Sequence, residues 1–182
     1  MRRLQAILLV AGLLAGCRGL PPEPPASSLE TRRLRAEPDR VWAAAQEIVA
    51  EQGYTIRRLD RGASVLETEW FPINPDYSAN LLVTAQEDRY SECAPPRLGQ
   101  AFRGKDARLR LEVSPSLRKG ETALTLQATF RTKQYLGLPM AAGAARAFVF
   151  CRSTGWLENE LAVRIQVRAL GGQLPRLRGG AR

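Results

Sequence analysis

Two stretches of alternating side chains, joined by a single turn, constrain the fold of this chain most. Over residues 108–113 and again over residues 124–131, apolar side chains take every second position and polar side chains fill the positions between. This alternation is typical of strands with one buried face and one wet face. Residues 115–120 supply Pro, Ser and Gly for the turn. The sequence therefore predicts an antiparallel strand pair as its clearest element.

An amphipathic helix is predicted before this pair and another after it. The first covers residues 38–52, with Pro38 at a position that suits a helix start and Gly53 at its end. The second begins after Ser153 or Thr154, either of which can cap a helix. Its apolar positions are Trp156, Leu157, Leu161, Val163 and Ile165. Two such helices bury their apolar stripes on a sheet, so we expect an α+β two-layer sandwich.

Shorter strands surround these elements. Residues 54–60 and 63–71 are expected to form a hairpin, and residues 146–151 a further strand. One face of that hairpin carries Leu66, Thr68 and Trp70. Prolines and glycines break residues 72–107, where only residues 81–85 are expected to pair, as an edge strand.

Composition limits the chemistry. The 182 residues contain no histidine, which excludes Ser-His and Cys-His nucleophiles, imidazole bases and most zinc sites. No phosphate-binding loop or metal-ligand spacing is present, so no cofactor or metal is expected. Because 45% of the residues are hydrophobic, a packed core is expected despite a net charge of +9. The composition favours a protein that is not an enzyme.

The N-terminal segment has the features of an export signal. Residues 1–3 are a basic start, and residues 4–14 are an apolar run of 11 residues interrupted only by Gln5, shorter than the roughly 17 to 25 that cross a bilayer. Leu14-Ala15-Gly16-Cys17 resembles the lipobox of bacterial lipoproteins. The resemblance implies cleavage before Cys17 and acylation of its sulfur and new amino group, which gives a stable anchor. The alternative is an ordinary signal followed by an incidental cysteine.

These features predict the organisation of the chain. It comprises a signal peptide (1–16), a Pro/Arg-rich tether from the lipidated Cys17 (17–36), a single α+β domain (37–170) and a basic flexible tail (171–182). Arg18 stands where enteric lipoproteins kept in the inner membrane carry Asp, which implies the periplasmic face of the outer membrane.

Positive charge suggests the partners. Removal of residues 1–16 leaves 25 basic and 18 acidic residues. In an exported protein this excess favours anionic lipid or lipopolysaccharide, besides envelope proteins, and not nucleic acid. A solvated basic surface without a specific partner is the alternative.

Two cysteines remain once Cys17 is assigned to the lipid. Cys93 and Cys151 are then the remaining pair, and the predicted compartment permits disulfides, so we expect them to form a disulfide with each other. Two inert buried thiols are an alternative, and a reactive thiolate or metal pair is a weaker one, because the chain has neither Cys-x-x-Cys nor histidine.

The first helix and hairpin carry a family resemblance. Val41-Trp42 near a helix start, Gly53-Tyr54-Thr55-Ile56, Asp60 before a glycine turn, and Glu69-Trp70 at a strand end resemble the helix-grip domains of BamC-type lipoproteins of the outer-membrane barrel-assembly machinery. The resemblance implies a curved antiparallel sheet around a long C-terminal helix. It also implies an accessory, non-catalytic role in outer-membrane assembly or integrity.

Other residues are weaker candidates for function. Glu67 and Glu69 share a strand face, as a carboxylate pair would, although a solvated face is the favoured interpretation. Ser153-Thr154-Gly155 opens a helix, where an anion can bind, but ordinary capping is favoured. A candidate partner-contact loop contains Tyr135, Leu136, Leu138, Pro139 and Met140. The alternative function is a periplasmic module that holds a lipid or hydrophobic ligand between the sheet and the last helix.

Overall fold

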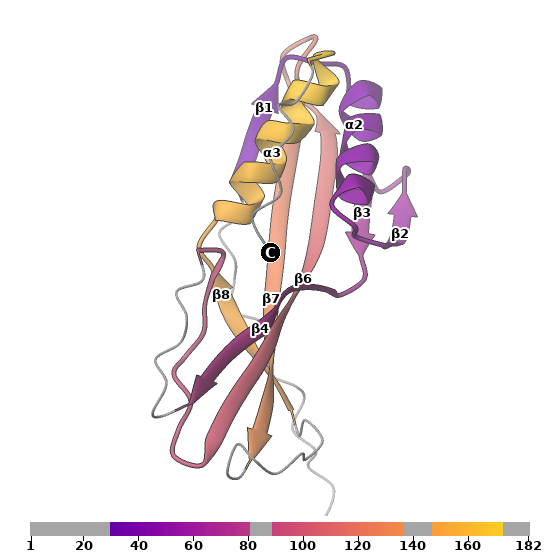
Figure 1. The fold of residues 1–182 in the computed structure, drawn as a ribbon. Coiled ribbons are helices and arrows are strands. Elements are labelled where there is room, and N and C mark those ends of the chain that lie inside the picture. Colours follow the sequence, from indigo (N-terminus) through magenta and orange to yellow (C-terminus); the bar gives the residue numbers. More distant parts are fainter. Residues whose placement is uncertain (1–29, 81–88, 137–146, 173–182) are drawn as a thin grey trace, which may run out of the picture.

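A computed structural model describes residues 30–80, 89–136 and 147–172 of the chain (Figure 1). The strands in these ranges are β1 (Glu30–Leu34), β2 (Ile56–Asp60), β3 (Val65–Thr68), β4 (Phe71–Asn80), β5 (Ser91–Glu92), β6 (Gln100–Pro115), β7 (Thr122–Leu136) and β8 (Ala147–Ser153). The helices are α2 (Pro38–Glu51) and α3 (Trp156–Ala169). The strand pairs are antiparallel, and the α+β class predicted from the sequence is confirmed.

The β6–β7 hairpin is the spine of the sheet. Its register runs from Gln100 opposite Leu136 to Pro115 opposite Thr122, so the pairing extends well beyond the alternating stretches. The apolar positions of the alternation are buried, with side chains such as Leu109 and Leu126 exposed by 1% or less. The polar positions between them face the other way, as the alternation predicts.

The neighbours of this hairpin change halfway along its length. Near the turn, β6 pairs with β3 and β7 pairs with β1. Farther from the turn, β6 pairs with β4 and β7 pairs with β8. The sheet therefore has two halves that share only the long hairpin, and they diverge in Figure 1.

Both helices cover one face of the half nearest the turn, where they lie side by side (Figure 1). Val41, Ile48 and Val49 of α2 are fully buried in a core shared with the sheet and α3. In α3, Leu161 and Ile165 are buried as expected. The prediction was wrong for Trp156 and Val163, which are 55% and 43% exposed, because the buried stripe of α3 is narrow. Neither helix in the described part of the chain has the length and apolar character that a bilayer-crossing helix needs.

The other half of the sheet has a small core of its own. Tyr77, Ala79 and Phe102 form it, with Val149 packed against them. Lys105 is 2% exposed beside this core: its Nζ lies 3.1 Å from Ser91 Oγ and 4.1 Å from the ring centre of Tyr77. The Lys105 amino group thus ties β6 to both β4 and β5.

Two regions contain more structure than the sequence predicts. Residues 30–34 are expected in the tether, yet they form β1, and Leu34 is 1% exposed. Much of 72–107 is expected to be irregular, but β4 and the first half of β6 lie there. The edge strand predicted at 81–85 falls outside the described residues, as do the signal peptide, Cys17 and most of the predicted tail.

Candidate functional site

The sheet face opposite the helices carries cations interleaved with aromatic rings. Across β6, β7 and β8, Arg103, Lys133 and Phe148 occupy one row, and the next row on the same face contains Asp106, Arg131 and Phe150. We call this surface the cation–aromatic band. Its residues are Trp70, Arg103, Asp106, Arg108, Arg131, Lys133, Tyr135, Phe148 and Phe150.

A bulge in β6 makes the band continuous. The register shifts between Arg103 and Lys105, and Gly104 between them has a φ of +64°. Glycine adopts this left-handed conformation without the strain that a side chain adds. Because of the extra residue, Arg103 and Asp106 point to the same face although they are three positions apart, while Lys105 turns inward.

Arg131 is the fixed centre of the band. Its Nε lies 3.1 Å from Asp106 Oδ2, and its guanidinium carbon lies 4.0 Å from the ring centre of Trp70 and 3.8 Å from that of Phe148. Both members of the ion pair are mostly buried, at 20% and 16% side-chain exposure. Arg131 therefore holds the aromatic side chains in place, and Asp106 compensates its charge.

Trp70 joins the band from the segment between β3 and β4. The ring centre of Trp70 lies 6.3 Å from that of Phe150, and the guanidinium carbon of Arg108 lies 5.0 Å from the Trp70 ring centre. The prediction that Trp70 shares a face with Leu66 and Thr68 was wrong, because β3 ends at Thr68 and the register against β6 shifts by one residue before β4 begins.

The end of the band farthest from the helices is the most exposed. Arg103 and Lys133 are directly opposite each other on β6 and β7. The guanidinium carbon of Arg103 lies 5.9 Å from the ring centre of Tyr135. Phe148 is 42% exposed. This end therefore presents positive charge and an open aromatic surface together.

The predicted contact loop begins at this same end. Tyr135 is half-buried in the band, and Leu136 at the end of β7 is 56% exposed. Leu138, Pro139 and Met140 lie outside the described residues. The structure thus places the first two residues of the loop beside the exposed part of the band.

The structure contains the disulfide between Cys93 and Cys151 that the sequence predicts. Cys93 follows β5 and Cys151 belongs to β8, where it lies opposite Phe130 of β7 and is buried. The bond therefore fastens the segment before β6 to the core side of the sheet. It lies on the face opposite the band.

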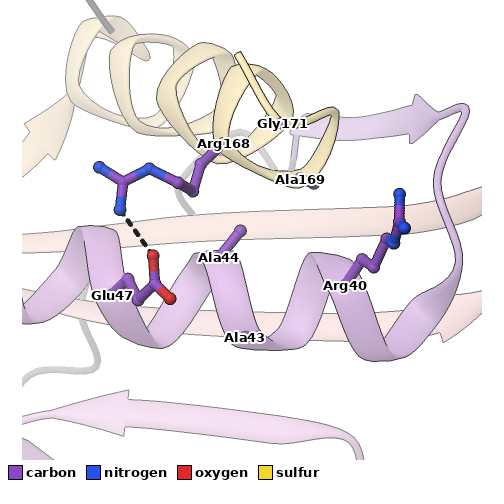
Figure 2. A pocket seen from close by; sticks show the side chains of 7 residues that line it. All are labelled: Arg40, Ala43, Ala44, Glu47, Arg168, Ala169 and Gly171. Atoms are coloured by element: carbon purple, nitrogen blue, oxygen red, sulfur yellow. Dashed lines mark hydrogen bonds and ion pairs between the residues drawn. The ribbon is translucent and has the colours of Figure 1, made fainter. Parts of the chain in front are cut away.

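A second surface feature lies between the helices (Figure 2). It is an open groove of about 290 Å³ lined by Arg40, Ala43, Ala44, Glu47, Arg168, Ala169 and Gly171. Arg168 crosses it, with guanidinium nitrogens 2.6 Å from Glu47 and 2.8 Å from Glu51, and these pairs raise the pKa of Arg168. The groove is shallow and already internally paired, so it is a weaker candidate than the band.

The space between the sheet and α3 is filled by side chains. Those that meet there belong to one core and include Leu109, Leu126, Phe130, Leu157 and Leu161. A hydrophobic ligand would need to displace them, so this part of the structure gives no support to a lipid pocket.

The remaining candidates from the sequence are engaged in structural contacts. Glu67 Oε1 lies 2.9 Å from an Arg110 nitrogen, and Glu69 is exposed. Ser153 Oγ donates to Glu158 Oε1 and accepts from the Gly155 N–H, so a carboxylate already occupies the start of α3. Within the three described ranges, no three acidic or cysteine side chains are grouped as a metal site would require.

The band was not among the sites predicted from the sequence. One signal was available, because Phe148 and Phe150 alternate in a predicted strand whose other face is needed for Cys151. Comparison with known proteins adds no assignment: no family model matches the chain, and no curated protein matches it.

Proposed function

We propose that this chain is a lipid-anchored, non-catalytic lipoprotein of the bacterial envelope, which acts as an accessory or scaffold in outer-membrane assembly or integrity. The basic start, the short apolar run and Cys17 support the anchor. The observation that carries the scaffold role is a sheet with one face packed into the core and one face on which the described residues present the cation–aromatic band. Such a domain offers a surface to a partner.

The finer assignment is a helix-grip-like domain related to BamC. It is supported by the order of helix, antiparallel strands and helix after β1, and by the packing of α3 on β7. Arg18 supports an outer-membrane location. The alternative, a module that holds a lipid internally, is less supported because the core beneath α3 is filled.

The anchor is tested by mass spectrometry of the protein purified from its native membranes. We expect a chain that begins at Cys17 and carries acyl groups, and we expect the Cys17→Ser variant to be released from the membrane fraction. An unmodified Met1, or an unacylated Cys17, would contradict the proposal.

The accessory role is tested by an affinity pull-down of the acylated protein from its own envelope after mild crosslinking. Recovery of barrel-assembly subunits supports the role, with the Cys17→Ser variant as the control for membrane co-localisation. Recovery of lipid without any envelope protein would favour the alternative module.

A further inference from the structure

We propose that the cation–aromatic band docks flat on the surface of a bilayer that contains anionic phospholipid. The inference deepens the proposed function, because the envelope location comes from it. It assigns to the domain a second, non-covalent membrane contact in addition to the acyl chains at Cys17.

Charge is the first argument. The band holds four cations and one acid, and that acid, Asp106, is already paired with Arg131. Lys133 is exposed, and the described residues offer it no ion pair. Its neighbour across the strands is Arg103, so two cationic side chains lie next to each other on this face. An anionic phosphate surface attracts such a cluster of cations.

Aromatic and apolar surface is the second argument. Phe148, Phe150 and Trp70 lie among the cations of the band, and Leu136 and Leu98 are 56% and 84% exposed at the same end of the sheet. Aromatic rings favour the headgroup level of a membrane, and cations beside them favour its phosphates. The opposite face is covered by α2 and α3 in one half of the sheet and carries the small core in the other, so this chemistry is confined to one side.

The length of the tether is the third argument. Because β1 begins at Glu30, only residues 18–29 separate Cys17 from the folded domain. These twelve residues span about 40 Å at full extension. An acylated chain therefore holds the band within reach of the bilayer at a high effective concentration, so a weak contact suffices.

The test measures how a protein that lacks its own acyl chains binds to lipid vesicles. The protein is the complete processed chain from residue 17, with Cys17→Ser, and the vesicles contain phosphatidylcholine either alone or mixed with phosphatidylglycerol. We expect sedimentation with the anionic vesicles only, and weaker binding as salt rises. Equal binding to both kinds of vesicle, or to neither, would overturn the proposal.

A charge-matched pair of variants locates the contact. Arg103→Ala with Lys133→Ala removes two cations from the band, whereas Arg118→Ala with Lys119→Ala removes two exposed cations from the β6–β7 turn at the far end of the sheet. Each cation near an anionic surface is worth about fivefold in binding, so the band variant, which lacks two cations, should bind about 25-fold more weakly. The turn variant should bind like the parent. Equal losses of binding in both variants would refute docking through the cation–aromatic band.

Two further measurements separate docking on lipid from charge attraction alone and from binding of nucleic acid. Phe148→Ser should weaken vesicle binding while leaving the circular dichroism and unfolding midpoint near those of the parent, because Phe148 is 42% exposed.

Cation–aromatic surfaces also suit single-stranded nucleic acid. Binding to a thymidine oligonucleotide that exceeds binding to anionic vesicles, and that is lost in the band variant, would replace the lipid proposal. Acylation of Cys17 is measured separately, so loss of vesicle binding leaves the proposed anchor intact.

Discussion

Oε1 of Glu158 lies 3.2 Å from the backbone nitrogen of Ala128, at the point where β7 changes partners from β1 to β8. Across the hairpin, Leu109 is the register partner of Ala128, and its backbone N–H donates to Thr68 Oγ1 at 2.9 Å. Leu109 lies where β6 changes partners from β3 to β4. At these two positions the neighbouring strand changes, so no backbone carbonyl is available to the N–H of Ala128 or of Leu109. The side chains of Glu158 and Thr68 accept these two hydrogen bonds instead.

The first prediction concerns this junction. Glu158→Leu removes the acceptor of both Ala128 N–H and Ser153 Oγ–H, which stay buried. We expect a loss of about 3 kcal/mol in the free energy of unfolding, since each unsatisfied buried donor costs roughly 1 to 3 kcal/mol. Glu158→Gln keeps one acceptor oxygen and should lose less. Urea denaturation of both variants measures the difference, and equal losses would show that packing of the side chain dominates.

The second prediction concerns the disulfide. Cys93 and Cys151 are 58 residues apart, and closing a loop of that length constrains the unfolded chain by about 4 kcal/mol. Cys93→Ser with Cys151→Ser should therefore lower the free energy of unfolding by about that amount. The parent should lose similar stability when a reductant is added, in a background of Cys17→Ser. A double variant that still responds to the reductant would argue against this assignment.

The third prediction is a loss of stability in alkali. Burial raises the pKa of Tyr54 well above its usual range, and the charges of Tyr90, Glu158 and Glu160 raise it further. The unfolded chain releases this proton near pH 10 and the folded chain only at higher pH, so Tyr54 stabilises the fold fully below about pH 10 and less above it. Tyr54→Phe should flatten this decline. Urea midpoints of both proteins from neutral to alkaline pH check it, and parallel curves would contradict it.

The sequence predicted the elements whose local pattern agrees with their final environment. The alternating apolar residues over 108–113 and 124–131 and the large apolar residues of α2 are each buried on one side, so periodicity alone identifies these elements. The strand β4 was missed because Pro72 and Pro75 interrupt it. An edge strand accommodates them, and its pairing with β6 shifts register at these positions.

The band was missed for a related reason. Arg108 and Arg131 were recognised as the wet positions of two strands, but their partners arrive from distant segments: Trp70 after the end of β3, and Phe148 and Phe150 from β8. Only the change of partners along the hairpin brings these segments to the same place. Such long-range placement leaves no periodic signal in the sequence. The disulfide was easier to predict, because two cysteines allow a single pairing.

The last prediction tests where the tether ends. The sequence pattern favours a tether over residues 30–34 because Leu34 is their single apolar residue among charged neighbours. In the structure Leu34 lies opposite Thr122 and is 1% exposed within the main core. Leu34→Ala should therefore cost about 3 kcal/mol in the free energy of unfolding, because a buried leucine leaves a cavity when truncated.

Arg35→Ala provides the matched control, since Arg35 is the exposed neighbour of Leu34. Its unfolding free energy should stay within about 0.5 kcal/mol of the parent. Chemical denaturation of the two variants gives the comparison directly. If both variants unfold like the parent, residues 30–34 belong to the tether after all, and the effective concentration of the band at the bilayer is lower than the docking proposal assumes.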